Sequence, residues 1–292
     1  MNRLALGTVQ FGMDYGINNR RGKVPRSEAF EILESARRSG IDTIDTASSY
    51  GDSEEVVGGF IRSNNSMFKI ISKLQACGYS GVRDIFESSL RKLGMSEMYG
   101  YLVHSFSSYK SDEKIWDELE DLRLSGKIKK IGFSLYSPDE LRHLTDSRVR
   151  FDIVQLPYSV FDQRFEQYLP GLKRKGIEVH ARSVFLQGLV FKKPDDLGKY
   201  FNKIRNKLLE LNRLADELDT SIVSLCIGFA MANKYIDKIV VGVDSLQNFE
   251  EITKWDSKGF IEKETVRAIS GLRIDDEDIV LPFKWESSRA KG

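Results

Sequence analysis

Two residues that can transfer protons follow a short β-branched segment near the start of the chain. The segment covers residues 41–45 and ends at Asp45, and Tyr50 follows five residues later in a polar loop. A carboxylate and a phenol suit acid–base chemistry when they sit at the carboxyl end of a buried strand. Taken alone, they are better explained as a capping carboxylate and a packed ring. Residues at other strand ends decide between these interpretations.

The elements that must position these residues alternate along the chain. Short apolar runs typical of strands buried on both faces recur about eight times, separated by amphipathic helical runs that end at glycines such as Gly40, Gly94 and Gly126. The predicted strands cover residues 4–7, 41–45, 68–73, 98–103, 130–134, 152–155, 177–182 and 238–242. The predicted helices cover residues 30–40, 54–61, 82–93, 112–124, 164–175, 201–218, 221–233 and 246–255, with another beginning at 138.

This alternation predicts parallel strands joined by helical crossovers. Eight such units in 292 residues suit an α/β protein of the (β/α)8 TIM-barrel class. A doubly wound open sheet is the alternative, but no G-x-G-x-x-G follows the first strand. No low-complexity linker interrupts the chain, so we expect one domain over residues 1–292, with a polar tail from about residue 286.

Composition excludes several classes of function. The 44 basic and 43 acidic side chains nearly cancel, which argues against nucleic-acid or membrane-surface partners. No apolar run approaches the roughly 20 residues of a membrane span, and the N-terminus does not resemble a signal peptide. Cys77 and Cys226 are expected to be free thiols in a reducing compartment, which predicts a cytoplasmic protein. His143 and His180 have no partners at metal-ligand spacing, so we expect no metal.

Reactive or polar residues stand at most of the predicted strand ends. The third strand ends at Lys73 and the fourth is followed by His104. In a barrel these residues converge with Asp45 and Tyr50 on one face, and an acid, a phenol, a cation and an imidazole together are harder to explain by packing.

The same residues lie in motifs that resemble the aldo-keto reductases. Asp-Thr-Ala-x-x-Tyr-Gly from Asp45, Ser-Glu-x-x-x-Gly from Ser53, Ser-Lys at Lys73 and Val-His-Ser at His104 occur in order and near the spacing of that family. The resemblance covers nearly the whole chain. It implies a barrel that binds NADP(H) across its C-terminal face, reduces aldehydes or ketones or catalyses the reverse reaction, and works as a monomer. The family's catalytic tetrad corresponds to Asp45, Tyr50, Lys73 and His104.

Carbonyl reduction explains why each residue type of the tetrad is needed. The cofactor supplies a hydride, and Tyr50 is expected to supply the proton. Because a free phenol has a pKa of about 10, we expect a cationic Lys73 to lower the pKa of Tyr50. Asp45 would pair with Lys73, and His104 would orient the substrate oxygen by a hydrogen bond.

The resemblance also implies a set of cofactor-binding residues. Ser134 and Gln155 match the side chains that hold the nicotinamide carboxamide, although Leu135 replaces the usual Asn. Arg182 stands where many members stack an aromatic ring on the nicotinamide, and a guanidinium plane can stack there. Alternatively, Arg182 turns outward to a substrate or phosphate anion. The remaining predicted cofactor-binding residues are Gly7, Thr8, Ser183, Leu186, Gly188, Gly242, Asp244, Ser245, Asn248 and Glu251.

Members selective for NADP(H) place cations at the positions of Gly242 and Asn248, and this chain has none there. Asp244 could repel a 2′-phosphate or accept from a ribose hydroxyl. NADP(H) is therefore the family default, and NAD(H) is an alternative.

Aromatic residues of the loops are candidates for the substrate site. A mixed aromatic and polar mouth suits a sugar, a sugar derivative or an aromatic aldehyde, and residues 7–12 and 181–188 resemble reductases of bacterial surface-polysaccharide pathways. Ordinary core packing is the alternative for each ring. The candidates are Phe11, Tyr15, Phe106, Tyr136, Tyr158, Phe161 and Phe185.

Two other classes of function remain open. A barrel of this family can serve as a cofactor-binding regulatory subunit, which the complete tetrad disfavours. A hydrolase or aldolase on the same fold could use Lys73 as a Schiff-base nucleophile if that lysine were unpaired.

Overall fold

The structure is a computed structural model that describes residues 2–255 and 262–285. The polar tail expected from about residue 286 lies outside the described residues.

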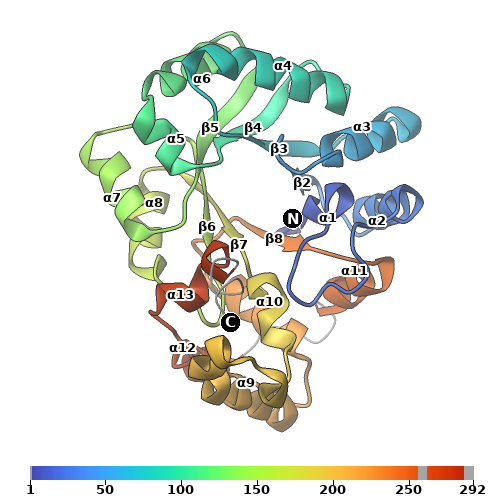
Figure 1. The fold of residues 1–292 in the computed structure, drawn as a ribbon, viewed down its shortest axis with the longest axis vertical. Helices are drawn as coiled ribbons and strands as arrows, with labels where there is room; N and C mark the ends of the chain where they lie inside the picture. Colours follow the sequence, from blue (N-terminus) through green and yellow to red (C-terminus); the bar gives the residue numbers. More distant parts are fainter. Residues whose placement is uncertain (1, 256–261, 286–292) are drawn as a thin grey trace.

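Eight parallel strands close into a barrel in the order of the sequence, as Figure 1 shows. The last strand pairs with the first, with Leu4 opposite Ile239 and Gly7 opposite Gly242. This pairing confirms the (β/α)8 barrel and rules out the open sheet. The strands are β1 Leu4–Gly7, β2 Thr43–Asp45, β3 Lys69–Leu74, β4 Met98–Val103, β5 Ile128–Ser134, β6 Ile153–Pro157, β7 Glu178–Arg182 and β8 Lys238–Gly242.

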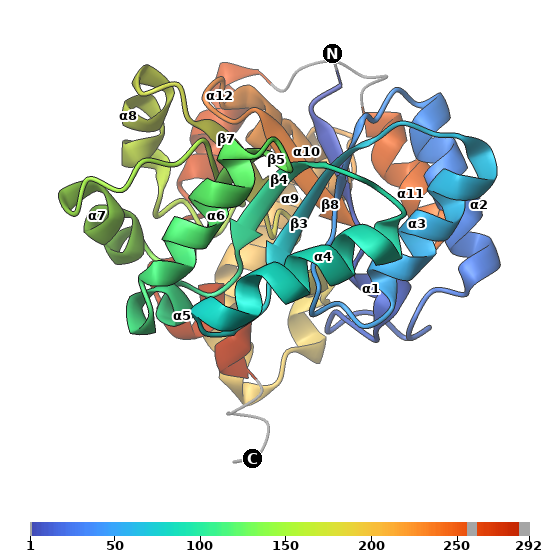
Figure 2. The ribbon, with the colours of Figure 1, turned by 90° about the horizontal axis from the view of Figure 1, so that it is seen from above.

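Helices surround the barrel, as Figures 1 and 2 show from two directions. Their apolar faces pack on the outside of the strands in one large core. The helices are α1 Val9–Gly12, α2 Arg26–Arg38, α3 Ser53–Asn64, α4 Val82–Leu93, α5 Phe106–Ser111, α6 Lys114–Leu124, α7 Pro138–Asp146, α8 Leu169–Arg174, α9 Arg205–Glu217, α10 Ile222–Ala232, α11 Leu246–Thr253, α12 Lys263–Ser270 and α13 Glu277–Val280. None of the helices in the described residues has the length and hydropathy that a membrane span requires.

Some helix boundaries differ from the sequence expectation. The helix predicted over residues 112–124 is preceded by a separate short helix, α5, because the backbone at Asp112 is extended. The segment predicted over residues 164–175 holds a 3-10 turn before α8, with Pro170 near the start of that helix. These differences fall in the loops and leave the strand order unchanged.

The strand periodicity explains why particular residues reach the end of the barrel. Ile71, Leu102 and Ile153 form a fully buried cluster of their own, separate from the outer core. Side chains two residues apart on a strand point to the same side. The interior position that follows each cluster member is therefore Lys73, His104 and Gln155 respectively, at the carboxyl end of the barrel.

The opposite end of the barrel is closed by ion pairs. Asp42 binds both Lys69 and Lys238, at 2.9 and 2.6 Å. Glu178 pairs with Lys130 and contacts the His180 Nε2 at 2.7 Å. Charges at this end of such a barrel serve stability, because the reacting groups lie at the other end.

Candidate active site

A buried ion pair forms the centre of the site. Lys73 Nζ lies 2.6 Å from Asp45 Oδ1, and the two side chains are only 1% and 5% exposed. The same ammonium donates to the carbonyl oxygen of Thr46 at 2.8 Å and contacts the Tyr50 hydroxyl at 3.4 Å. Its three N–H groups therefore each have a partner. A lysine held in this way is poorly available as a Schiff-base nucleophile.

The protonation of this group differs from the expectation that Lys73 lowers the pKa of Tyr50. Burial raises the pKa of the Tyr50 phenol above its usual range, Asp45 and Tyr136 raise it further, and Arg182 acts in the opposite direction. Burial also lowers the pKa of Lys73, although Asp45 opposes that shift. Tyr50 is consequently a neutral phenol near neutral pH and carries the proton that a donor needs.

His104 faces the ring of Tyr50. The two rings meet edge to face at 5.7 Å between centroids, and His104 Nδ1 lies 3.1 Å from the Ser49 hydroxyl oxygen. Burial lowers the pKa of His104 to about 3, and the charges of Lys73 and Arg182 contribute. The imidazole is therefore neutral. If Ser49 donates to Nδ1, the ring proton is on Nε2 and can be donated to a ligand.

A close contact between two glycines places the loop that carries Tyr50. A Cβ at Gly12 would overlap the carbonyl oxygen of Tyr50, and a Cβ at Gly51 would overlap the backbone of Gly12. Gly51 also has a positive φ of 55°, which favours glycine. Helix α1 and the start of α3 can approach each other at these positions because neither has a side chain there.

Gln155 binds the tetrad rather than pointing away from it. Its Nε2 donates to Asp45 Oδ2 at 2.7 Å, so both oxygens of that carboxylate have a partner. Ser134, which the sequence paired with Gln155 as a carboxamide ligand, is buried and lines the adjoining cavity.

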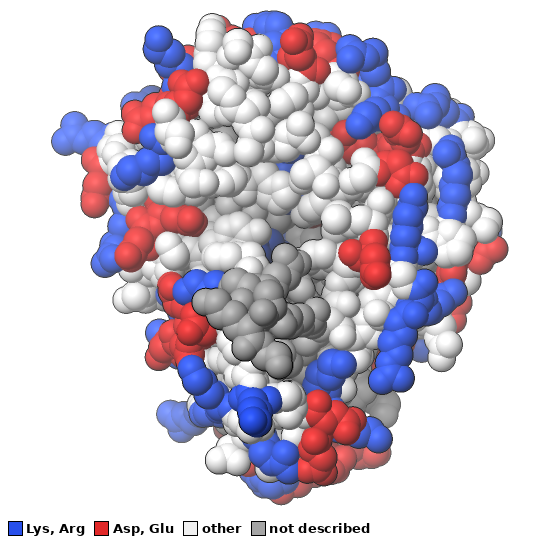
Figure 3. Space-filling model, in the orientation of Figure 1, with Lys and Arg blue, Asp and Glu red and all other residues white. Residues whose placement is uncertain are grey.

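An open cavity of about 1160 Å³, a volume that includes open solvent at its mouth, lies over the tetrad. Figure 3 shows this face of the molecule, with charged side chains gathered at the periphery and a mostly uncharged, hollowed centre. Its lining includes Tyr50 and His104 of the tetrad and, after β8, Asp244 and Asn248. The predicted cofactor residues in the lining are Gly7, Thr8, Ser134, Gln155, Arg182, Ser183, Gly188, Gly242, Asp244 and Asn248.

Two polar atoms of the lining favour a polar ligand. Gln10 Oε1 and Arg182 Nε are buried and have no hydrogen-bond partner within the described part of the chain. Buried polar atoms are rarely left in this state, because losing water without a replacement bond costs about 1–3 kcal/mol. The size of the cavity and the polar side chains of its lining fit a dinucleotide cofactor together with a small substrate.

The loop after β7 has a strained backbone and crosses to the loop after β1. Ser183, Leu186 and Gln187 all have positive φ angles, of 60°, 45° and 52°. Such conformations concentrate at ligand sites. The Gln187 carbonyl accepts from the Ile17 amide at 3.1 Å, and its side chain donates to the Tyr15 hydroxyl at 2.8 Å. The two loops thus meet beside the cavity.

The end of the cavity at α11 is acidic. Ser245 caps the helix by accepting from the Asn248 amide at 3.1 Å. Glu28, from α2, accepts from the Leu246 amide at 3.1 Å. Arg21 pairs with both oxygens of Glu28, at 2.9 and 2.8 Å, and donates to the carbonyl oxygen of Asp244 at 3.1 Å. A carboxylate of this chain therefore already occupies the helix N-terminus.

Residues 3–273 match the sequence model of the Aldo/keto reductase family. The chain belongs to the aldo/keto reductase family. Members of this family are NAD(P)H-dependent oxidoreductases that act on small carbonyl compounds, so the resemblance read from the sequence is confirmed.

Relatives of this aldo/keto reductase cover almost its full length. The uncharacterized oxidoreductase YqkF of Bacillus subtilis (strain 168) is 22% identical, over 96% of this chain and 94% of that protein. L-galactose dehydrogenase of Arabidopsis thaliana is 24% identical, over 89% of each. The holo form of aldo-keto reductase AKR11C1 from Bacillus halodurans superposes with a TM-score of 0.77, at 17% identity, over 92% of this chain and 91% of that one. This structural similarity shows the shared fold.

The structure places the predicted aromatic residues of this aldo/keto reductase in two groups. Tyr15, Tyr136 and Phe185 line the cavity. The other four lie outside its lining: Phe11, Tyr158 and Phe161 are buried in the core, and Phe106 packs on Tyr109 and His143. These four rings pack between helices and strands, as the alternative of ordinary core packing predicted. They are not part of the proposed substrate site.

Three predicted cofactor residues also lie outside the lining. Leu186 is fully buried, Ser245 caps α11, and Glu251 lies in the second half of that helix and is exposed. Sequence reasoning missed other lining residues. Position in the loops after β1 and β7 was the available signal for Val9, Gln10, Gly16, Asn18, Asn19, Val184, Gln187 and Phe191. Val240, inside strand β8, also lines the cavity.

Proposed function

We propose that this protein reduces a small aldehyde or ketone to an alcohol and that Tyr50 is the proton donor. The observation that supports this most is the contact of the neutral Tyr50 phenol with the buried Lys73–Asp45 pair, opposite a neutral His104.

Each residue of the tetrad has a separate role in the proposed reduction. When bound, the nicotinamide cofactor supplies a hydride to the carbonyl carbon. Tyr50 transfers its hydroxyl proton to the carbonyl oxygen, and the phenolate that remains is stabilised by the ammonium of Lys73. Asp45, held by Gln155, keeps that ammonium in place and balances its charge. His104 donates a hydrogen bond to the carbonyl oxygen and orients it.

The cofactor is proposed to lie along the cavity. Ser134 would then bind the nicotinamide, Ser183 and Gly188 of the strained loop would lie near the pyrophosphate, and Asp244 and Asn248 would lie near the adenosine; all five residues line the cavity.

The variant Tyr50→Phe tests the catalytic assignment. We expect turnover to fall by about 10²–10⁴ because the proton donor is lost, while cofactor affinity in a fluorescence titration is unchanged. Oxidation of the reduced cofactor would be followed with a panel of aldehydes and sugars. Tyr79→Phe, on the surface, is the matched control. Near-normal turnover in Tyr50→Phe would contradict the proposal.

The acidic end of the cavity favours NAD(H) over the family default of NADP(H). Glu28 occupies the N-terminus of α11 and neutralises Arg21, and Asp244 adds a second carboxylate. A 2′-phosphate at this end would meet like charges, whereas ribose hydroxyls can donate to a carboxylate. We therefore propose that NAD(H) is the preferred cofactor.

The ratio of kcat/KM with NADH to that with NADPH tests this choice. We expect NADH to be favoured by at least about tenfold, equivalent to about 1.4 kcal/mol. Glu28→Gln and Asp244→Asn should each lower the ratio, and Glu31→Gln, an exposed residue of the same helix α2, should not. A wild-type preference for NADPH would contradict the proposal.

The substrate is proposed to be a polar carbonyl compound such as a sugar or sugar derivative. Gln10, Asn18, Asn19 and Gln187 add hydrogen-bonding groups to the tyrosines of the lining. A plant relative named for L-galactose supports this class. We also propose that the protein acts as a cytoplasmic monomer. Cofactor binding without turnover on any carbonyl in the panel would favour the alternative, a regulatory subunit.

A further inference from the structure

Arg182 carries a positive charge that no carboxylate balances in the described residues. It ends β7 and is partly buried. Its two terminal nitrogens donate to the carbonyl oxygen of Leu135 at 2.9 Å and to the Ser183 hydroxyl at 3.2 Å. Its Nε is buried without a partner there. Among residues 2–255 and 262–285, only two of the five N–H groups of this guanidinium therefore have hydrogen bonds, and because Nε is buried, the remaining N–H groups of the two terminal nitrogens are the ones a ligand can reach.

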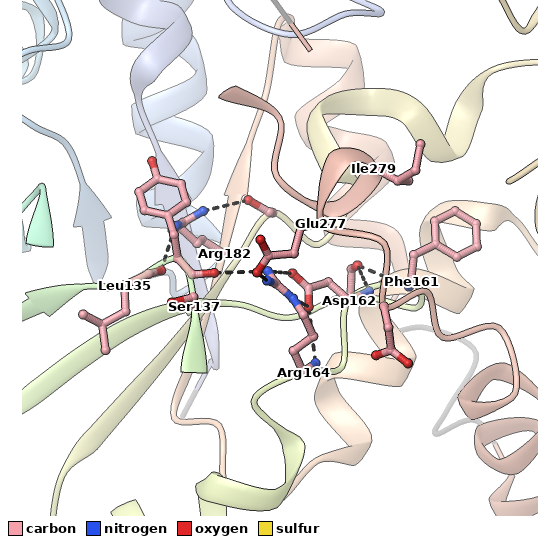
Figure 4. A network of polar contacts seen from close by, with 12 residues as sticks. Leu135, Ser137, Phe161, Asp162, Arg164, Arg182, Glu277 and Ile279 are labelled. Carbon is pink, nitrogen blue, oxygen red and sulfur yellow. Dashed lines mark hydrogen bonds and ion pairs between the residues drawn. The ribbon is translucent and has the colours of Figure 1, made fainter. Parts of the chain in front are cut away.

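A neighbouring arginine shows how this protein compensates such a charge elsewhere. Arg164 binds both oxygens of Asp162, at 2.9 and 2.8 Å, and one oxygen of Glu277 at 3.2 Å. Figure 4 shows Arg164 between these two carboxylates, with Arg182 close by and bonded to Leu135. Burying a charge without an opposite charge is costly, so an uncompensated arginine in a cavity wall implies a ligand that brings the anion.

The guanidinium is held in a fixed plane. Its central carbon lies 4.1 Å from the centroid of the Tyr136 ring, and Phe283 meets the same ring edge to face at 5.2 Å. The carbonyl oxygen of Tyr136 is in turn bound by Arg164 at 3.1 Å. A stacked, tethered arginine presents its free N–H groups in a constant direction, which favours recognition of a planar oxyanion.

The charge of Arg182 acts at the reacting end of the cavity. It lowers the pKa of His104 and contributes to lowering the pKa of Lys73. The charges of Asp45 and Lys73 cancel in their pair, so the positive charge of Arg182 is left over at that end. The acidic residue Asp244 lies at the adenosine end of the lining.

We propose that Arg182 binds an oxyanion of the substrate, and that the protein prefers carbonyl compounds carrying a carboxylate or phosphate over their neutral analogues. This inference rests on the proposed reductase function and narrows its substrate class. It assigns Arg182 to substrate selection, whereas the sequence also allowed a role in stacking on the nicotinamide.

Matched substrate pairs test the preference. Succinic semialdehyde is compared with its methyl ester for the carboxylate, and glyceraldehyde 3-phosphate with glyceraldehyde for the phosphate. We expect the wild type to have a higher kcat/KM for at least one charged member, and the pair that shows it identifies the anion. In Arg182→Gln the charged-to-neutral ratio should fall by about tenfold to a hundredfold, the loss expected for a hydrogen bond to a charged group.

Two control variants separate the possible causes of a change in the charged-to-neutral ratio. Arg182→Lys keeps the charge without the fork geometry and should retain part of the ratio. Arg150→Gln removes an exposed arginine and should leave the ratio unchanged. The proposal is overturned if the charged-to-neutral ratio of the wild type is near one for both substrate pairs. It is also overturned if Arg182→Gln leaves that ratio unchanged. A large loss of cofactor affinity with an unchanged ratio would assign Arg182 to the cofactor and also overturns it.

A binding measurement keeps this test separate from the reductase proposal. Calorimetric titrations with succinate and with inorganic phosphate, neither of which has a carbonyl group to reduce, should show binding of at least one anion to the wild type and at least tenfold weaker binding of that anion to Arg182→Gln. If neutral aldehydes are reduced but neither anion binds, the reductase function stands and the oxyanion site fails. If an anion binds through Arg182 and no carbonyl compound is reduced, the reductase function fails and the oxyanion site remains.

Discussion

Gln155 Nε2 donates a hydrogen bond of 2.7 Å to Asp45 Oδ2, although the two residues are 110 positions apart in the chain. Asp45 therefore receives Lys73 on one oxygen and an amide on the other, and its side chain is buried. A buried carboxylate needs both oxygens satisfied, so the Gln155 hydrogen bond offsets part of the cost of burying Asp45 beside Lys73.

Replacing Gln155 should weaken this arrangement in a way that depends on the new side chain. Gln155→Leu removes one charge-assisted hydrogen bond and should lower the free energy of unfolding by about 1.5–3 kcal/mol in urea titrations. Gln155→Glu places a second carboxylate beside Asp45. The loss of unfolding free energy in this variant, relative to the wild type, should therefore be larger at pH 8 than at pH 5, where one carboxyl can be protonated. An equal loss at both pH values would contradict this explanation.

The Lys73–Asp45 pair should show strong coupling. Lys73→Met leaves Asp45 charged and buried and should lower the free energy of unfolding by about 3–5 kcal/mol. The double variant Asp45→Asn with Lys73→Met removes the isolated charge and should be more stable than Lys73→Met alone. Additive effects in this double-mutant cycle would show that the pair is not coupled.

His104 should make stability depend on pH. Its pKa in the folded protein is about 3, below the roughly 6.5 of an unfolded chain. As the pH falls, the unfolded state therefore takes up a proton on His104 at a higher pH than the folded state does. The contribution of His104 to stability is complete above about pH 6.5 and is lost as the pH falls toward 3. The difference in unfolding free energy between wild type and His104→Gln should shrink by about 2 kcal/mol from pH 7 to 4.5. A constant difference would contradict the lowered pKa.

Gly12 should tolerate no side chain. Gly12→Ala forces a Cβ into the backbone at Tyr50, so the loop must move. We expect a loss of about 1–3 kcal/mol in unfolding free energy and a clear drop in turnover, because the phenol shifts away from Lys73. Gly198→Ala is the control, since its φ is −64° and no atom lies within 4 Å of the added Cβ. Normal turnover in Gly12→Ala would show that the close approach does not position Tyr50.

The sequence predicted the strand order and the tetrad because both depend on local patterns. Strands buried on both faces are continuous apolar runs, and the residue after such a run lies at the barrel end whichever helices surround it. Lys73 and His104 could be placed in this way from their neighbours alone. The short helix α5 was missed because its six residues carry too little periodicity.

What the sequence alone determined about this protein is therefore its barrel, its family and the four residues of the tetrad, which include the proposed proton donor. The tertiary structure decided which groups interact. Gln155 hydrogen-bonds Asp45, and Glu28 accepts a hydrogen bond from the α11 N-terminus. Arg182 stacks on Tyr136 but pairs with no carboxylate in residues 2–255 and 262–285. The tertiary structure also separated Tyr15 and Tyr136, which line the cavity, from core rings of the same residue type. The physical reason is that a side chain's environment depends on segments that are distant in sequence and meet only when the barrel closes.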